Sequence, residues 1–432
     1  MSRRILFLLL LIPIFVSCQE KDSSADIAGG LVIGSMEPVG RPPVILSWRH
    51  QILDRERYKA LADEWFAYVK EHPKEPEAWI EWGDALRYSD RRDEAERKYA
   101  KAFEVDSTNA AAIVAHCAQM LHEKDNDVWK LAHERLLRAT HIDPKCADIY
   151  YSLWITSLRS RDEETAQECL KRLVRLGDMS SALFNYGRNM IAGAPQNAII
   201  FTNGDNDTYP PLAYQAISGD RTDVSIVNLS LLNTTWYISY LRDKGLPIDL
   251  DDAAINELKN TPESLIGAQI QRRLYERVVN DEIPRPLYYA VTVNKGNRAL
   301  EYRTVLEGLL ERIVPGGEST EQAPELDLAR TRELFDSVYR IDGMTDLSVD
   351  WERESSLAGL AFNYAGLLDQ LGSGLINQGS LAVGGPYLVD AIEIWAFHGK
   401  PERAASLIEM MEEKDPNSKF VKEAREIVEN MK

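Results

Sequence analysis

The sequence contains few of the residues that catalyse or bind metals through sulfur or imidazole. It has 4 cysteines and 7 histidines in 432 residues, and neither type occurs between positions 197 and 346. That gap excludes a Ser-His-Asp or Cys-His arrangement, and a zinc site built from His and Cys, within the stretch. Apart from Cys18, only Cys117, Cys146 and Cys169 remain, all in helical patterns. We therefore expect core cysteines and no disulfide framework.

Basic segments and phosphate-binding loops are also absent. The formal net charge is −18 at pH 7, and no long block of Lys and Arg occurs. This balance excludes nucleic acid and anionic lipid surfaces as the main partner, because both require basic protein surface. Gly204 stands alone instead of in a glycine-rich phosphate loop. The hydrophobic content of 44% is ordinary, so the length favours two or three globular domains.

The one long apolar run lies at the N-terminus. Arg3 and Arg4 precede residues 5–16, a run too short to span a bilayer as a helix and typical of a signal-peptide core. Residues 15–18, Phe-Val-Ser-Cys, then resemble a bacterial lipobox, although the lipobox pattern prefers leucine where Phe15 stands. An ordinary secretory signal followed by an incidental cysteine is the alternative interpretation.

The lipobox resemblance implies cleavage before Cys18 and attachment of a lipid, with acyl chains such as palmitate, to its sulfur. Residues 1–17 are then a lipoprotein signal peptide, and residues 18–50, rich in Ser, Gly, Pro and charge, form a tether. We expect a protein anchored in the bacterial cell envelope that faces the periplasm or the cell exterior. The sequence does not distinguish the inner from the outer membrane.

Residues 51–194 carry a repeated helical pattern that is similar to tetratricopeptide repeats. Large and small residues alternate at the spacing of that repeat, where small residues allow two helices to approach closely. The first repeat contains Trp79, Trp82, Gly83, Leu86, Ala95, Tyr99 and Ala102. The pattern returns in the helical residues 326–432, which end in a capping helix over 420–431. The tryptophans at repeat spacing are expected in the core; these are Trp79, Trp82, Trp129, Trp154 and Trp395.

The pattern of residues 195–325 predicts a small α/β domain between the two helical domains. Apolar strands are predicted over 198–201, 223–229 and 286–293. Helices are predicted over 209–218 (capped by Asp207 or Thr208), after Ser230 and Asn233, over 263–280 and over 299–310. The predicted fold class is therefore α with α/β, in which tetratricopeptide helical repeats flank a small parallel, Rossmann-like sheet.

Polar residues follow each predicted strand, where ligands bind in parallel sheets. They provide carboxylate, amide and hydroxyl oxygens, which suit Ca²⁺, Mg²⁺ or a sugar. We expect Asp205, Asp207 and Asn233 to converge at one sheet edge, with Asp205 and Asp207 as the candidate metal ligands. The candidate ligand-binding residues are Asn203, Asp205, Asn206, Asp207, Thr208, Asn228, Ser230, Asn233, Trp236 and Asn294.

The Asp205-Asn206-Asp207 triplet has three interpretations. It matches the D-x-D metal motif of nucleotide-sugar transferases. It also approaches the D-x-D-x-T pattern of haloacid-dehalogenase enzymes, but Thr208 comes one residue early. The third interpretation is structural: the side chains accept hydrogen bonds from loop N–H groups and cap the next helix. No cofactor is certain on any of the three.

The string FTNGDNDTYP (201–210), with VNLSLLNT (227–234) and YYAVTV (288–293), resembles the soluble C-terminal region of bacterial protein O-mannosyltransferase-like glycosyltransferases. In that family, the chemistry is assigned to a multi-spanning membrane half, which has no counterpart here. The resemblance therefore carries over no transferase activity. We expect a protein-interaction scaffold that binds a protein or peptide, with a non-enzymatic ligand-binding α/β module. The alternative is an accessory to envelope glycosylation that binds a metal or glycan.

Overall fold

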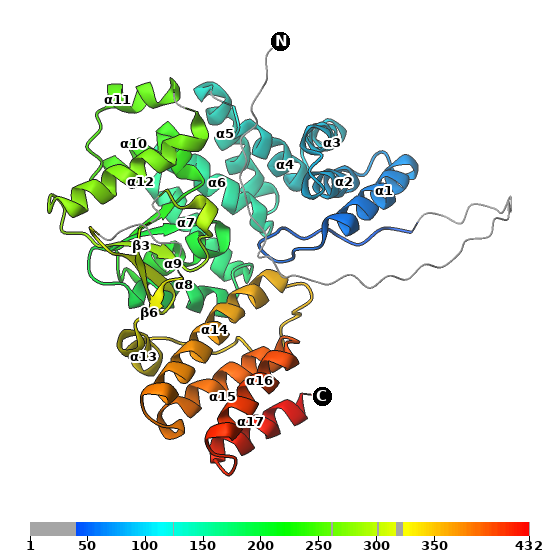
Figure 1. Cartoon of the computed structure of the whole chain (residues 1–432). Helices are drawn as coiled ribbons and strands as arrows, with labels where there is room; N and C mark the ends of the chain where they lie inside the picture. Colours follow the sequence, from blue (N-terminus) through cyan, green and yellow to red (C-terminus); the bar gives the residue numbers. More distant parts are fainter. Residues whose placement is uncertain (1–39, 124, 261, 300–301, 317–322, 432) are drawn as a thin grey trace. The chain divides into compact units, whose positions relative to one another are not determined.

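The computed structural model describes residues 40–123, 125–260, 262–299, 302–316 and 323–431. Cys18, the signal peptide and most of the tether lie outside these residues. The described chain divides into two compact units (Figure 1). The first, called the repeat unit, contains residues 40–47 and Ile52–Ser152; the second, called the mixed unit, contains Trp48–Gln51 and the described residues from 153 to 431.

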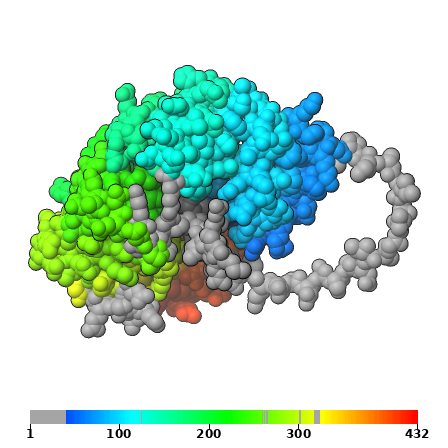
Figure 2. All heavy atoms as spheres, turned by 90° about the horizontal axis from the view of Figure 1, so that it is seen from above, coloured from blue at the N-terminus to red at the C-terminus, as the bar shows by residue number. Residues whose placement is uncertain are grey.

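The repeat unit consists of helical hairpins. Several helices begin at polar caps: the side chains of Asp54, Asn109 and Asp125 accept hydrogen bonds from backbone N–H groups in the first turn. In the space-filling view its atoms form a continuous surface coloured blue to cyan (Figure 2). The helices are α1 (Arg55–Glu71), α2 (Pro76–Tyr88), α3 (Arg92–Val105), α4 (Ala110–Met120), α5 (Asn126–Ile142) and α6 (Ala147–Ser160), the last of which continues into the mixed unit.

The small residues at repeat spacing lie in tight helix contacts. Ala95 and Ala102 are no more than 1% exposed, and a Cβ added to Gly83 would collide with the ring of Tyr99. The helical-repeat part of the predicted fold is thus confirmed. The expectation for the tryptophans holds only in part, because Trp129 and Trp154 are buried whereas Trp79, Trp82 and Trp395 are half-buried.

The mixed unit passes directly from a helix into a sheet. The helical pattern continues in α7 (Glu163–Leu176) and α8 (Ser181–Gly193). The next element is the strand β1 (Ile199–Thr202), so no second helix directly follows α8 to complete a repeat. α8 packs on α9 (Asp205–Ser218) so closely that a Cβ on Gly187 would meet the Pro210 backbone at 2.5 Å. This contact joins the last repeat-like helix to the α/β domain.

The sheet has six strands among the described residues, in the order β2-β1-β3-β5-β4-β6. β1 pairs in parallel with β2 and β3, so the predicted parallel core is confirmed. The whole sheet is nevertheless mixed, because β5 runs antiparallel to both β3 and β4. The remaining strands are β2 (Ser225–Asn228), β3 (Leu287–Ala290), β4 (Thr304–Glu307), β5 (Leu310–Ile313) and β6 (Glu325–Leu326).

Two predicted helices differ from the structure. The sequence predicts a helix over residues 299–310, but β4 and β5 form a hairpin there, turned at Gly308 with φ of 60°. β-branched residues such as Thr304 and Val305 favour the strand. Helix α9 begins at Asp205 instead of residue 209, with Gly204 as its N-cap. Contrary to the prediction, neither Asp207 nor Thr208 is therefore the N-cap residue, although the Asp207 carboxylate accepts the N-cap N–H from the third position of the helix.

Further helices surround the sheet and complete the C-terminal part (Figure 1). Gly372 allows α14 and α15 to approach closely, because a Cβ there would meet Gly384 O at 2.9 Å. The predicted capping helix is confirmed as α17. No helix of the described residues is long and apolar enough to cross a membrane. The elements are η1 (Leu231–Asn233), α10 (Thr235–Asp243), α11 (Asp252–Glu257), η2 (Leu258–Asn260), α12 (Glu263–Val279), η3 (Lys295–Asn297), α13 (Leu328–Ser337), α14 (Ser355–Gln378), α15 (Leu381–Phe397), α16 (Pro401–Lys414) and α17 (Lys419–Asn430).

Candidate functional site

The Asp207 carboxylate lies inside the loop that follows β1. Its side chain is at the third position of α9, and the residue is 3% exposed. Oδ1 accepts a hydrogen bond from Gly204 N at 2.8 Å, Oδ2 accepts one from Asn203 N at 2.8 Å, and the Thr292 hydroxyl also donates to Oδ2. Burial raises the pKa of Asp207. The carboxylate therefore closes the loop and links it to the end of β3.

Thr208 and Asn228 form a second internal cluster. The hydroxyls of Thr202 and Thr208 are 2.7 Å apart, and Asn228 Nδ2 donates to Thr208 Oγ1 at 2.9 Å. Asn228 Oδ1 accepts from Leu231 N at 2.9 Å. All three polar side chains are buried. These two predicted site residues therefore connect β1, β2 and α9 below the surface and do not face solvent.

The outer part of the loop contacts neighbouring segments of the mixed unit. Asn203 Oδ1 accepts from Asn297 Nδ2 at 2.6 Å, and Asn206 Nδ2 donates to Arg49 O at 2.8 Å. Asp205 lies 3.5 Å from Arg49 Nη1, and its side chain remains 40% exposed. Asp205 is thus the loop carboxylate that solvent reaches.

The candidates after β2 and β3 have separate roles. Asn233 Nδ2 donates to Leu229 O at 3.1 Å, and its Oδ1 accepts from Gly267 N at 3.0 Å, which ties η1 to α12. Ser230 precedes η1 without a side-chain cap bond, and Trp236 is half-buried with its ring 5.6 Å from that of Tyr237. Asn294 Oδ1 is buried and accepts no hydrogen bond from the described residues.

The structure thus brings Asp207, Asn203 and Thr208 to one end of the parallel strands, as expected for residues that follow them. Asn233 belongs to a different cluster: among the described residues, no hydrogen bond or ion pair joins it to Asp205 or Asp207. Both Asp207 oxygens already accept hydrogen bonds from the loop, so Asp205 is the carboxylate of the triplet that remains accessible to a ligand. No group of three or more His, Cys, Asp or Glu suited to a metal occurs in the described part of the chain.

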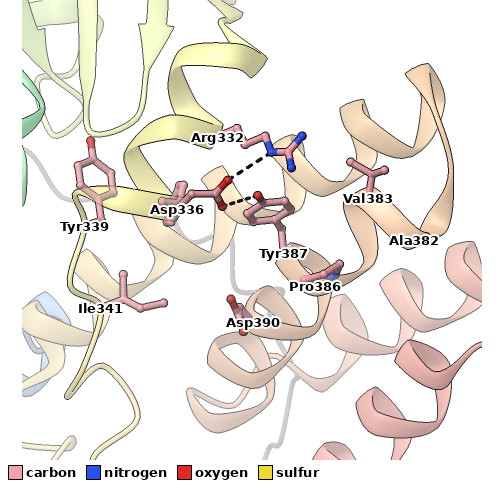
Figure 3. A pocket seen from close by; sticks show the side chains of 10 residues that line it. Arg332, Asp336, Tyr339, Ile341, Ala382, Val383, Pro386, Tyr387 and Asp390 are labelled. Carbon is pink, nitrogen blue, oxygen red and sulfur yellow. Dashed lines mark hydrogen bonds and ion pairs between the residues drawn. The ribbon is translucent and has the colours of Figure 1, made fainter.

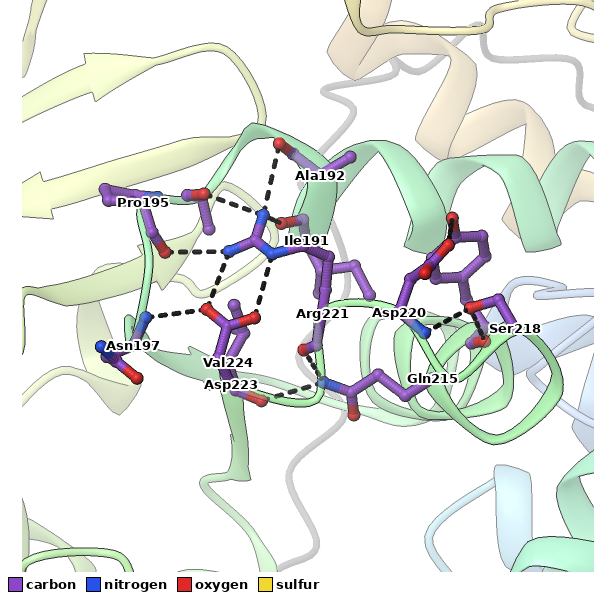
Figure 4. A network of polar contacts seen from close by, with 12 residues as sticks. Ile191, Ala192, Pro195, Asn197, Gln215, Ser218, Asp220, Arg221, Asp223 and Val224 are labelled. Carbon is purple, nitrogen blue, oxygen red and sulfur yellow. Dashed lines mark hydrogen bonds and ion pairs between the residues drawn. The ribbon is translucent and has the colours of Figure 1, made fainter.

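Arg221 is an important residue that the sequence did not single out. It lies in the left-handed region with φ of 52°. Its guanidinium donates to Ile191 O at 2.5 Å, Ala194 O at 3.0 Å and Pro195 O at 2.9 Å, the carbonyls around the end of α8 (Figure 4). It also pairs with Asp223 at 3.1 Å, which lowers the pKa of that carboxyl. This cluster satisfies helix-end carbonyls and is structural.

A cavity of about 460 Å³ lies between α13 and α15. Tyr387 of α15 donates to Asp336 Oδ1 at 2.5 Å, and Arg332, one turn before Asp336 on α13, donates to Asp336 Oδ2 at 3.3 Å (Figure 3). The volume is that of a small-ligand pocket. Its lining residues are Arg332, Phe335, Asp336, Tyr339, Ile341, Ala382, Val383, Pro386, Tyr387 and Asp390.

Comparisons with known proteins match part of the chain. The model of the family described as "TMEM260-associated domain 2" matches residues 183–261, which run from α8 through the Asp207 loop to α11. No curated protein matches. Among solved structures, the chain is similar to one titled "Structure of Naa15/Naa10 bound to HypK-THB", with 14% identity and a TM-score of 0.24. That similarity covers 86% of this chain and only 63% of the other, and it is too weak to support an argument.

Proposed function

We propose that this chain is an envelope-anchored lipoprotein whose helical repeats bind a protein partner and whose α/β domain is a non-enzymatic module. A lipid on Cys18 would hold the protein at a bacterial membrane, facing the periplasm or the cell exterior. The helical-repeat architecture is the basis of the scaffold role. The strongest single support is an aromatic surface on the repeat unit.

This aromatic surface consists of Phe66 on α1 with Trp79 and Trp82 on α2. The ring centroid of Trp82 lies 5.0 Å from that of Phe66 and 5.7 Å from that of Trp79. Phe66 is 42% exposed, and both tryptophans are half-buried although they occupy repeat positions. Aromatic side chains grouped in this way are typical of the centres of protein–protein interfaces.

Two lysines lie over the same rings. Lys70 Nζ is 3.9 Å from the Phe66 ring centroid, and Lys98 Nζ is 3.7 Å from that of Trp82. Such cation–π contacts contribute about 0.5–1 kcal/mol at exposed sites and hold the rings in place. The surface therefore offers ordered rings beside positive charge on a chain that is acidic as a whole. An acidic–aromatic partner surface would complement it.

The α/β domain supports a non-enzymatic assignment. Its Asp207 carboxylate, the most conspicuous acid of the motif, bonds to Asn203, Gly204 and Thr292 of the same domain. A general base or metal ligand needs an oxygen directed at substrate or metal. We therefore assign Asp207 to loop structure.

Site-specific photo-crosslinking in cells tests the scaffold role. A photoreactive amino acid at Phe66, which is 42% exposed, should give a discrete crosslink to another protein. Ile217 on α9 is 47% exposed and is the matched control position, where no such crosslink is expected. Crosslinks of equal yield at both positions, or none at Phe66, would contradict the proposal.

A second candidate function is an accessory role in envelope glycosylation, in which the α/β domain binds a metal or glycan. The match to the TMEM260-associated domain over residues 183–261 favours it, as does the 40% exposure of Asp205. Calorimetric titration with Ca²⁺, Mg²⁺ and a mannose-containing oligosaccharide separates the candidates. Heat that disappears in an Asp205→Ala variant would favour this second function; no heat with the wild-type protein would exclude these ligands.

A further inference from the structure

Residues 40–47 have no regular secondary structure and contact α1 and α2 within the repeat unit. Arg41 Nη1 contacts Glu75 Oε1 at 2.5 Å, Trp65 Nε1 donates to Pro43 O at 3.2 Å, and Ile45 N donates to Glu81 Oε2 at 2.7 Å. Three helix side chains thus hold one short segment that forms no helix or strand of its own.

Two of these three contacts involve the backbone of the segment. The carbonyl of Pro43 and the N–H of Ile45 are available in any extended peptide, so this part of the recognition does not depend on side chains. Trp65 is fully buried, and its indole donor is directed at the segment. Burial raises the pKa of Glu81 to about 8, and the residue is half-buried with the segment in place.

Buried and exposed side chains follow a pattern along the segment. Pro42 and Ile45 are buried, whereas Arg41, Pro43 and Val44 are exposed, Val44 to 53%. The Arg41 guanidinium also lies 5.7 Å from the centroid of the Trp65 ring. A peptide with two prolines is already close to extended, and it loses little entropy when it binds. The face therefore fits the pattern Arg-Pro-Pro-x-aliphatic.

We propose that this face of α1 and α2, formed by Trp65, Glu75 and Glu81, is a binding site for an extended proline-rich peptide of a partner protein, and that residues 41–45 occupy it as an internal ligand. The inference rests on the proposed scaffold function and adds a second surface to it, separate from the aromatic surface of Phe66, Trp79 and Trp82. The ligand of this second surface is an exposed Arg-Pro-Pro-x-aliphatic segment. Release of the internal segment is the step that opens the site.

Competition between the internal segment and a free peptide tests this inference. The probe is a fluorescent peptide with the sequence of residues 40–47, GRPPVILS, titrated into full-length protein. An Ile45→Ser variant removes the buried aliphatic anchor of the internal segment and should bind the peptide at least tenfold more tightly than wild type, because the tethered competitor is weakened. Val44→Ser, at the exposed neighbour, should behave as wild type. Adding Glu75→Ala to Ile45→Ser should weaken binding again.

Hydrogen exchange gives a second measurement that needs no variant. The Ile45 amide should exchange faster than the amide of Leu86 inside α2, and excess peptide should accelerate it further. An Ile45 amide as protected as that of Leu86, with or without peptide, would make the segment a fixed part of the fold and overturn the inference. Equal peptide affinity of the two Ser variants would do the same.

A dimer that forms by exchange of residues 41–45 between two copies would assign the site to a second copy of this chain and also overturn the inference. None of these outcomes bears on the scaffold role itself. That role is tested by crosslinks from Phe66, which do not depend on the segment.

Discussion

At the scale of single residues, Asp207 decides how the most conspicuous motif is interpreted. Its carboxylate accepts hydrogen bonds from two backbone N–H groups and one hydroxyl. The structural interpretation of the Asp205-Asn206-Asp207 triplet accounts for these contacts, whereas the D-x-D metal motif requires oxygens that face a ligand. Asp205 differs from the buried Asp207 because its side chain is 40% exposed.

Replacing Asp207 should destabilise the fold. Asp207→Ala leaves the N–H groups of the half-buried residues Asn203 and Gly204 without this acceptor, and the loss of such an acceptor costs about 1–3 kcal/mol. Asp207→Asn should also be destabilising, because its amide presents a donor to one of these N–H groups. Asp205→Ala is the control and should change the free energy of unfolding by less than about 0.5 kcal/mol. Urea denaturation of the three variants checks the prediction; equal effects at positions 205 and 207 would refute it.

The sequence identified which residues follow the strands but not where their side chains point. Turn-forming residues after apolar strands predict a polar sheet edge. A residue such as Asn228 at this edge can bond to a ligand or to another side chain, and in the structure it bonds to Thr208. Tertiary contacts decide between the two, and the sequence pattern does not specify them. Arg221 gave no signal in the sequence, because its partners are backbone carbonyls of a distant helix end.

At the scale of elements, the long amphipathic helices and the apolar strands β1, β2 and β3 were predictable, whereas the β4–β5 hairpin was not. The repeat spacing located α2 and α3, and the apolar pattern located α12 and α17, within a few residues. The β4–β5 hairpin was mistaken for a helix because its strands, TVLE and LERI, contain charged residues and lack the apolar runs by which β1 and β3 were predicted. The early start of α9 depends on Asp207 accepting the Gly204 N–H, a contact that spacing alone did not reveal.

The packing of α2 on α3 gives a test of the repeat register. Ala102 is fully buried, so Ala102→Leu should cost about 1–3 kcal/mol by overpacking. Lys101→Leu adds a leucine at the adjacent exposed position and should have little effect on the melting temperature. Thermal melts of both variants check this; an unchanged melt for Ala102→Leu would mean that the register is wrong.

Residues 48–51 form a short segment that His50 fixes within the mixed unit. His50 Nδ1 lies 3.0 Å from Glu354 Oε1, and Nε2 lies 3.3 Å from Asp178 Oδ1. Hydrogen bonds to Asp178 and then Glu354 raise the pKa of His50 from 6.5 to about 9. The imidazolium therefore pairs with both carboxylates at neutral pH.

This shift predicts a pH-dependent stability. Because the pKa is raised in the folded state, the stabilisation is fully present below pH 6.5 and is lost as the pH rises through about 9. Between pH 6 and pH 9.5, wild type should lose on the order of 2 kcal/mol more than His50→Ala. Urea titrations at the two pH values measure the difference. Identical pH dependence of the two proteins would rule out this role for His50.

At the scale of the whole molecule, the sequence predicted helical domains around a small sheet, and the described residues confirm that fold class. A mixed sheet was not predicted, because the order of strands depends on pairing between residues far apart in the chain. The anchor remains a prediction, since Cys18 lies outside the described residues.

The anchor can be tested directly. Cys18→Ser removes the one lipidation site that the sequence indicates, so the mature protein should move from the membrane fraction to the soluble fraction. Cys146→Ser, at a half-buried cysteine of the repeat unit, is the control and should remain membrane-bound. Detergent partitioning of both variants measures the outcome. A processed Cys18→Ser protein that still partitions into detergent would disprove the lipoprotein assignment.

In the proposed function, the aromatic surface of Phe66, Trp79 and Trp82 binds the protein partner. Its most direct test is the dissociation constant of the protein captured by crosslinking at Phe66, measured with purified wild type, Phe66→Ala and Ile217→Ala. Truncation of a central aromatic contact costs about 2 kcal/mol or more, roughly a thirtyfold change in affinity. We expect that loss for Phe66→Ala and unchanged affinity for Ile217→Ala, with both variants folded. Unchanged affinity for Phe66→Ala would contradict it.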